Sequence, residues 1–219
     1  MYAACSGFVY SLSIADSMIK SGLYKNILVV GAEVLSRVTD YSDRTTCILF
    51  GDGAGAVVLS RADDEESKIY SHKLTADGEL GDLLRLPLGG SENPFTLENL
   101  QKHPPYIKMQ GREIFKHATR GMAKCSEDVL KQANMEPSQV DWLIPHQANA
   151  RIIDVVAKRF DFPMEKVIVE IQNMGNNSSA SIPICLDKAV RANRIQRGQN
   201  ILLTAFGGGL TCGSLLMRY

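Results

Sequence analysis

The chain has 219 residues, and its 24 Lys and Arg side chains balance 24 Asp and Glu side chains. This balance argues against a global attraction to nucleic acid or to a membrane surface, so an anionic partner needs a local basic patch. The apolar runs are strand-sized, far below the ~20 residues that a membrane span requires.

The five cysteines are scattered without a Cys-x-x-Cys pair, which favours reduced cytoplasmic thiols over disulfides or a metal site. Cys5 stands before an apolar run at residues 8–19, which predicts a buried helix ending near residue 21. The free N–H groups and dipole at that helix start would stabilise a thiolate. An inert core thiol is an equally weighted alternative.

A buried strand is predicted at residues 26–33, followed by a glycine-rich tight turn at 51–55 and a core strand at 56–59. A nucleotide-binding loop is disfavoured there because a strand follows the glycines, whereas such loops open a helix. The charged run at 61–66 indicates a solvated link and a candidate domain boundary.

Residues 69–74 predict another strand, and residues 77–106 predict a long loop or flap that could border a substrate entrance. Apolar spacing predicts a helix over 111–133. Residues 140–144 then predict a short buried strand that ends just before His146, with an amphipathic helix after residue 149.

His146 therefore lies at a strand-to-helix junction, where open α/β sheets commonly bind ligands. The helix N-terminus should keep its imidazole neutral and able to donate from an N–H. A structural or capping role is the commoner fate of such a histidine. On the following helix, Arg151, Lys158 and Arg159 share one face. This face is either a docking patch for an acidic partner or an ordinary solvated surface.

A strand predicted at 167–169 enters a loop of small residues that contains Asn176, and a helix follows at 179–192. Asparagines in such loops usually serve turns, but this loop enters the same sheet edge as His146. Paired strands at 200–206 and 212–218 flank a glycine triplet. The triplet could point a backbone N–H at a ligand, or form only a hairpin turn.

Five segments carry a family resemblance because they occur in one order at compatible spacing. They are Ala3-Ala4-Cys5-Ser6-Gly7-Phe8, Phe50-Gly51-Asp52-Gly53-Ala54-Gly55, Pro145-His146-Gln147-Ala148-Asn149, Gly175-Asn176-Asn177-Ser178 and Ala205-Phe206-Gly207-Gly208-Gly209. With them the chain resembles beta-ketoacyl-acyl carrier protein synthase III, of the thiolase-like superfamily, from its first residue to its last.

The resemblance implies an α/β thiolase-like fold with mixed sheets and layered helices, usually as a homodimer. Residues 1–64 would be the remainder of an N-terminal half that carries the nucleophile, and residues 65–219 the C-terminal half. About the first hundred residues of a family member would then be absent. We expect such a chain to expose apolar sheet surface and to have poor activity on its own.

The resemblance also implies roles for individual residues. Cys5 would be the nucleophile, His146 and Asn176 would donate to a thioester carbonyl, and the N–H groups of Cys5 and Gly208 would form an oxyanion hole. The substrate contacts would be Arg44, at a position that helps hold the coenzyme A nucleotide, and Phe206, an aromatic beside the nucleophile. The surface that docks acyl carrier protein would contain Arg151, Lys158, Arg159 and Lys116.

The implied reaction is decarboxylative condensation of an acyl-CoA starter, with acetyl-CoA favoured, and malonyl-acyl carrier protein. This step initiates fatty acid synthesis and needs no metal or cofactor beyond the coenzyme A thioester. Three alternatives remain open: a type III polyketide synthase-like condensation, a noncatalytic fragment or interaction subunit, and a degradative thiolase. The last would use a second cysteine near the final glycine loop, which makes Cys212 a position to check.

Overall fold

A computed structural model describes residues 1–62 and 67–219 of the chain. The boundary predicted between residues 64 and 65 lies outside the described residues. None of the helices in these ranges is both long and apolar enough to cross a membrane.

The chain begins with a short 3-10 turn, η1 (Ala4–Ser6), which runs directly into helix α1 (Gly7–Lys20). Of the apolar residues that predicted this helix, Phe8, Val9, Leu12 and Ala15 are buried, whereas Met18 is 37% exposed. Gly22 has a φ of +78°, a backbone conformation that suits glycine just beyond a helix end. The predicted helix is confirmed, and its start holds Cys5 at the edge of the core.

Strands β1 (Asn26–Val34) and β2 (Asp52–Ser60) form a two-stranded antiparallel sheet, joined through η2 (Leu35–Val38) and a loop. Its inward face packs on α1 through Val29. Large apolar side chains on the opposite face are exposed: Leu28, Val30, Val34 and Val58. The expectation of exposed apolar sheet surface is confirmed.

The predicted glycine-rich turn at 51–55 is wrong, because residues from Asp52 onward already belong to β2. The glycines serve close packing instead. A Cβ on Gly53 would lie 2.7 Å from the Asn177 side chain, and one on Gly55 would lie 2.9 Å from the Ile184 backbone. Small residues in β2 therefore let the segment that carries Asn176 lie against this strand.

The main sheet has the strand order β3-β8-β7-β6 and is mixed, since β6 and β7 run parallel while the other neighbours are antiparallel. Its strands are β3 (Lys68–Ala76), β6 (Trp142–Pro145), β7 (Asn200–Gly207) and β8 (Thr211–Arg218). β7 and β8 confirm the predicted pair of C-terminal strands. β6 confirms the strand predicted before His146, and β3 confirms the one predicted at residues 69–74.

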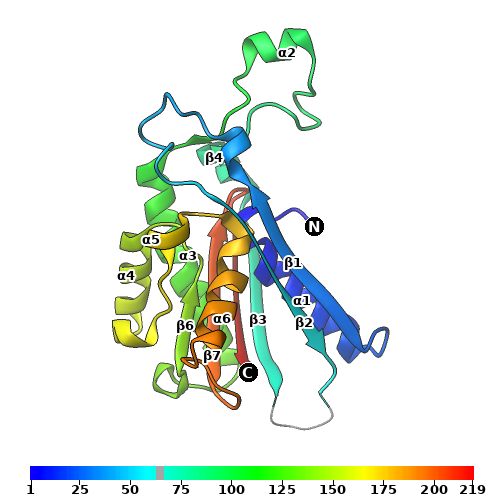
Figure 1. Cartoon of the computed structure of the whole chain (residues 1–219), viewed down its shortest axis with the longest axis vertical. Helices are drawn as coiled ribbons and strands as arrows, with labels where there is room; N and C mark the ends of the chain where they lie inside the picture. The colour runs from blue at the N-terminus through cyan, green and yellow to red at the C-terminus, as the bar shows by residue number, and fades with distance from the viewer. Residues whose placement is uncertain (63–66) are drawn as a thin grey trace.

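Helices cover both faces of this sheet (Figure 1). On β7, Leu202 and Phe206 pack into a core with α3 and α4, whereas Ile201, Leu203 and Ala205 pack into a core with α1 and α6. This alternation follows from the two-residue period of a strand. The helices are α3 (Gly111–Gln132), α4 (Ala150–Arg159) and α6 (Ser181–Arg191). The order of layers is therefore α3 and α4, the main sheet, α1 and α6, and the β1-β2 sheet.

The long segment after β3 leaves this body and carries α2 at its far end, as Figure 1 shows. It has little regular structure, as predicted. Its elements are η3 (Gly78–Leu83), β4 (Leu84–Arg85), α2 (Leu97–Lys102) and β5 (Lys108–Met109), with β4 paired to β5.

The strand predicted at 167–169 is absent. Val167 forms only an isolated bridge with Leu143, and the Ile168 N–H donates to the Leu143 carbonyl at 2.9 Å. The 3-10 turn η5 (Met164–Lys166) ends just before this stretch and α5 (Ile171–Met174) begins just after it. Only residues 167–170 lie between them, and their pairing with β6 does not extend beyond this single bridge. A further turn, η4 (Pro137–Gln139), precedes β6, and η6 (Ser178–Ala180) precedes α6.

Candidate active site

Cys5 is a buried thiol in η1, immediately before the N-terminus of α1. Burial raises the pKa of the Cys5 thiol to about 11, and the nearby Glu33 carboxylate acts in the same direction, while a hydrogen bond from the Ser178 side chain lowers it. The thiol is therefore protonated at neutral pH. The predicted thiolate at the helix N-terminus is wrong for this structure, because the cost of burying the charge dominates.

The backbone of the β7–β8 turn lies directly against Cys5. A Cβ on Gly207 would be 2.7 Å from the Cys5 backbone nitrogen, and one on Gly208 would be 3.0 Å from the Leu84 carbonyl oxygen. Only glycine allows both approaches. The sequence singled out Gly208 within the triplet, and the structure adds Gly207, whose Cβ position is the nearer of the two to the Cys5 backbone nitrogen. A hydrogen bond from the Ser6 hydroxyl to the Thr211 carbonyl, at 3.2 Å, holds this turn to η1.

His146 follows β6 directly and is only 1% exposed. Its backbone N–H donates to the Thr204 carbonyl of β7 at 2.8 Å. Its Nδ1 lies 2.7 Å from the Ser181 hydroxyl. Burial lowers the pKa of His146 to about 3, so the imidazole is neutral at physiological pH. The predicted neutral state is confirmed, but its cause is burial and not the helix N-terminus, since α4 begins only at Ala150.

Asn176 is a buried residue held by backbone bonds to the loop before β2. Its N–H donates to the Leu49 carbonyl at 2.8 Å, and its carbonyl accepts from the Gly51 N–H at 2.9 Å. The side-chain Oδ1 accepts the Ser178 N–H at 2.9 Å. With Oδ1 engaged within the loop, the other polar atom of the side chain is Nδ2, which can only donate.

Residues 176–181 connect the three predicted catalytic side chains. Asn176 starts the run, the Ser178 side chain hydrogen-bonds the Cys5 thiol, and the Ser181 hydroxyl contacts His146. The run is fixed to β1 through Glu33, whose carboxylate accepts the Ser179 hydroxyl at 2.6 Å. The structure thus joins the thiol, the imidazole and the carboxamide through one short segment.

The serines in this run and the carboxylate that anchors it were not predicted as site residues. They are Glu33, Ser178, Ser179 and Ser181. The small side chains after Asn176 were visible in the sequence, but they indicated only a close loop. Which serine bonds which partner depends on the positive φ of +49° at Ser178, and no sequence pattern reveals that angle.

The arrangement combines a buried thiol with two neutral side chains that carry N–H groups. His146 Nδ1 and Asn176 Oδ1 are both occupied by bonds within the protein. Donors fixed in a dry site stabilise negative charge on an oxygen far better than donors in water do. In the described ranges, no cluster of three or more His, Cys, Asp or Glu side chains could hold a metal ion.

The two predicted substrate contacts lie in different settings. Phe206 is buried on the β7 face that packs on α3, where a Cβ on Gly121 would come within 3.3 Å of its ring. Arg44 is exposed in the loop between η2 and β2. That loop is shaped by Asp43, whose carboxylate accepts the Thr45 N–H at 2.9 Å.

The predicted basic surface is exposed, and Arg151 lies in the first turn of α4. The other three cations are close to acidic neighbours: Lys158 pairs with Asp154 at 2.8 Å, Arg159 with Glu127 at 3.5 Å, and Lys116 with Glu113 at 2.7 Å. Exposed pairs of this kind contribute little stability, so an anionic surface could compete for the cations. Local pairing nevertheless makes this patch less positive than the sequence suggested.

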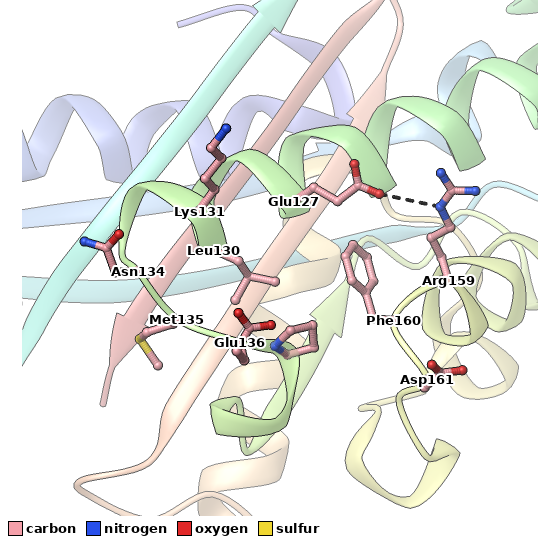
Figure 2. A pocket seen from close by; sticks show the side chains of 10 residues that line it. Glu127, Leu130, Lys131, Asn134, Met135, Glu136, Arg159, Phe160 and Asp161 are labelled. Atoms are coloured by element: carbon pink, nitrogen blue, oxygen red, sulfur yellow. Dashed lines mark ion pairs between the residues drawn. The ribbon is translucent and has the colours of Figure 1, made fainter.

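Two surface hollows lie apart from the residues described above. The first, of about 500 Å³, lies between the ends of α3 and α4 and includes the Glu127–Arg159 ion pair (Figure 2). The second, of about 570 Å³, lies between η2 and the segment around Tyr106. Neither is lined by Cys5, His146 or Asn176. Arg37 lines the second hollow, whereas the predicted Arg44 does not.

Cys212 belongs to a different environment from Cys5. Its thiol is buried and hydrogen-bonds Cys125 of α3, and it lies 3.5 Å from the Cβ position of Gly121. A thiolase would need its second cysteine in the same pocket as the nucleophile. The orientation of Cys212 towards α3 therefore disfavours the degradative thiolase alternative.

Comparison with known proteins identifies the family. Residues 1–78 match a family model described as 3-oxoacyl-[acyl-carrier-protein (ACP)] synthase III, and residues 130–219 match the model of its C-terminal part. A relative from Xanthomonas campestris, named beta-ketoacyl-[acyl-carrier-protein] synthase III, is 51% identical over 99% of this chain and 65% of its own length. The chain thus spans about two thirds of the length of such relatives.

Solved structures agree with this result. The 3-oxoacyl-[acyl-carrier-protein] synthase III of Aquifex aeolicus superposes with a TM-score of 0.91 at 49% identity, over 100% of this chain and 66% of the other. The priming beta-ketosynthase of the R1128 polyketide pathway superposes with a TM-score of 0.89 at 32% identity, over 100% and 64%. The chain therefore has the predicted thiolase-like fold and belongs to the 3-oxoacyl-[acyl-carrier-protein] synthase III family.

Proposed function

We propose that this chain carries the active site for decarboxylative condensation of an acyl-CoA starter with malonyl-acyl carrier protein, which initiates fatty acid synthesis. Family membership supports the reaction class. The observation that carries the proposal is the hydrogen-bonding of His146 and Asn176. Asn176 Oδ1 accepts the Ser178 N–H, which leaves Nδ2 to donate, and His146 Nδ1 lies 2.7 Å from the Ser181 hydroxyl, which leaves Nε2 as the ring nitrogen available to a thioester oxygen.

In the first half-reaction the Cys5 sulfur attacks the carbonyl carbon of the acyl-CoA. The N–H groups of Cys5 and Gly208 bind the oxyanion of the tetrahedral intermediate, a contribution of about 3 kcal/mol per donor in characterised enzymes. The carbon–sulfur bond to coenzyme A then breaks. Because the resting thiol is protonated, its proton leaves with the coenzyme A sulfur, and an acylated Cys5 remains.

In the second half-reaction the malonyl thioester loses carbon dioxide. The electron pair of the broken carbon–carbon bond becomes an enolate, whose oxygen accepts hydrogen bonds from His146 Nε2 and Asn176 Nδ2. The enolate carbon attacks the acyl group on Cys5 and releases the sulfur, which recovers a proton from the medium. Neutral donors suit this step because they stabilise the enolate oxygen without protonating it, and the low pKa of His146 keeps it neutral.

The same proposal includes the partners. Arg44 would help hold the coenzyme A nucleotide, Phe206 would be the aromatic beside the nucleophile, and the exposed face around Arg151 would dock the acidic carrier protein. No cofactor beyond the thioester substrate is required. The free cysteines fit a cytoplasmic enzyme. In its full-length form we expect the protein to be a homodimer, with neither nucleic acid nor membrane as a partner.

We further propose that full activity needs the part of the family enzyme that this chain does not span. The exposed apolar face of the β1-β2 sheet supports this, because an isolated enzyme seldom leaves such a face uncovered. The mass of the natural polypeptide in its source cell tests this directly. A natural protein of this length with robust activity would refute it.

The central experiment follows acyl transfer. The chain is incubated with radiolabelled acetyl-CoA, and label on Cys5 is located by peptide mapping, with Cys5→Ala as the control. Malonyl-acyl carrier protein is then compared with malonyl-CoA as the second substrate. Label on Cys5 that is consumed only by malonyl-acyl carrier protein is the expected result.

The other outcomes separate the alternatives. Consumption by malonyl-CoA alone would favour the polyketide synthase-like reaction. A folded chain in which Cys5 never acquires label would favour a noncatalytic interaction subunit.

A further inference from the structure

The hydroxyl of Ser181 occupies a position between the imidazole of His146 and the backbone that follows it. Ser181 is the first residue of α6 and is fully buried. Its Oγ lies 2.7 Å from His146 Nδ1 and 3.3 Å from the backbone nitrogen of Gln147. One hydroxyl therefore makes two hydrogen bonds, one with the His146 ring and one with the Gln147 N–H, and the second fixes the direction of the first.

The Gln147 N–H can only donate, so the Ser181 oxygen accepts this bond. The hydroxyl then has one proton to donate, and His146 Nδ1 is the acceptor beside it. If Nδ1 carried the proton instead, the Ser181 hydroxyl would have no acceptor among the bonds made by the described residues. A buried donor without an acceptor is unfavourable, because no hydrogen bond replaces the ones that it made to water.

The side chain of Gln147 holds this geometry in place. It is fully buried and donates from Nε2 to the Pro145 carbonyl at 2.7 Å and to the Ile168 carbonyl at 3.2 Å. Its Oε1 accepts the Glu170 N–H at 2.8 Å. Three bonds to neighbouring backbone fix the segment around His146, and so they fix the direction in which the Gln147 N–H points.

We propose that Ser181 is a positioning residue that holds His146 in the tautomer with its proton on Nε2. The inference rests on the proposed function only for its consequence: Nε2–H can donate to a thioester oxygen, whereas the other tautomer would place a lone pair there. Asn176 takes no part in this arrangement, because its Oδ1 accepts the Ser178 N–H instead.

The experiment is heteronuclear NMR on the 219-residue chain with ¹⁵N-labelled histidine. Two-bond proton–nitrogen correlations distinguish the protonated from the unprotonated ring nitrogen, and His146→Gln assigns the signals. In the wild type we expect Nε2 protonated and Nδ1 bare. In Ser181→Ala we expect a mixture of tautomers, and in Ser181→Thr, which keeps the hydroxyl, a return to the wild-type pattern. Ser126→Ala is the matched control, because Ser126 is equally buried but bonds Ser214.

Kinetics give the second readout. Ser181→Ala should slow malonyl decarboxylation about tenfold or more, up to the roughly 10²-fold loss of one oxyanion donor, while acylation of Cys5 stays within about twofold. A wild type with its proton on Nδ1 would overturn the proposal, even if the alanine variant fails to fold. So would a folded Ser181→Ala chain with an unchanged tautomer. The NMR result does not depend on turnover, so it decides the role of Ser181 even if the isolated chain has low activity. A folded chain whose Cys5 is never acylated would count against the proposed function and not against the role of Ser181.

Discussion

Asn176 Oδ1 accepts the backbone N–H of Ser178 at 2.9 Å, and this bond closes a turn in which Ser178 has a φ of +49°. Asparagine side chains commonly close turns in this way. Here the turn also has a chemical result. It fixes Oδ1 within the loop and leaves Nδ2 to donate, so the residue that shapes the loop is also the residue that we propose as a donor.

Replacing Asn176 with Asp tests that result. A carboxylate could still accept the Ser178 N–H, so the turn should persist, but the outward NH₂ donor would be lost and a negative charge would face the enolate. Malonyl decarboxylation should fall by about 10²–10³-fold or more. Labelling of Cys5 by acetyl-CoA should change little. Equal losses in both half-reactions would contradict the proposed division of roles.

The pKa of Cys5, raised by burial to about 11, predicts an unusual alkylation profile. Because the thiolate is the reactive form, the rate of iodoacetamide modification should climb about tenfold per pH unit from pH 7 past pH 9 without levelling off. Ser178→Ala removes the hydrogen bond that lowers this pKa, so its rate at any fixed pH should be lower. Cys5→Ala gives the background from the other cysteines. A plateau near pH 8 would contradict the prediction.

His146 links stability to pH. Its folded pKa of about 3 lies below its ordinary value of 6.5, so the unfolded chain binds the proton more readily. The stability that this group contributes is fully present above pH 6.5 and is lost as the pH falls towards 3. Between pH 7 and 5 the free energy of unfolding should drop about 2 kcal/mol more in the wild type than in His146→Gln. Urea titrations of both proteins measure it, and a larger drop in the variant would contradict the assignment.

Much of the fold was predictable because local patterns and tertiary packing agree. The buried helix after Cys5 has few charges on any face, and the C-terminal strands are long apolar runs on either side of a glycine triplet. His146 was identified because a strand ends immediately before it. In each case a pattern within ten to twenty residues already specifies the element.

The errors arose where distant segments decide the outcome. Gly53 and Gly55 looked like turn residues, yet they are strand residues that admit the segment around Asn177 and Ile184. Likewise, the charge state of Cys5 depends on how deeply η1 is buried, which its position before a helix did not reveal. Ser181 was not predicted as a site residue because its partner, His146, is 35 positions away in the sequence.

Gly31 offers a stability test of the contact between β1 and residues 176–181. A Cβ there would lie 2.6 Å from the Ser179 carbonyl oxygen and 3.1 Å from the Ala180 nitrogen, both backbone atoms that cannot turn aside. Gly31→Ala should therefore lower the free energy of unfolding by about 1–3 kcal/mol and disturb the site. Gly78→Ala is the control, because a Cβ at that position meets no atom within 4 Å. Similar stabilities for the two variants, measured by urea unfolding, would argue against this contact.

The exposed face of the β1-β2 sheet leads to a prediction about association. Leu28 and Val58 are cross-strand partners and remain 64% and 65% exposed. A two-stranded sheet with an apolar outer face is a template for self-association, so sedimentation velocity should show concentration-dependent oligomers of the isolated chain.

Charged side chains on that face should weaken this association. The pair Leu28→Lys and Val58→Glu should shift the distribution towards monomer while changing the free energy of unfolding by no more than about 0.5 kcal/mol, since neither residue lies in the core. Leu97→Lys on α2 is the matched control, because Leu97 is 83% exposed but lies far along the chain from the sheet. If Leu97→Lys disperses the oligomers and the double variant does not, α2 is the associating surface. That outcome would contradict the prediction, because the apolar outer face of the β1-β2 sheet would then remain in contact with water without driving association.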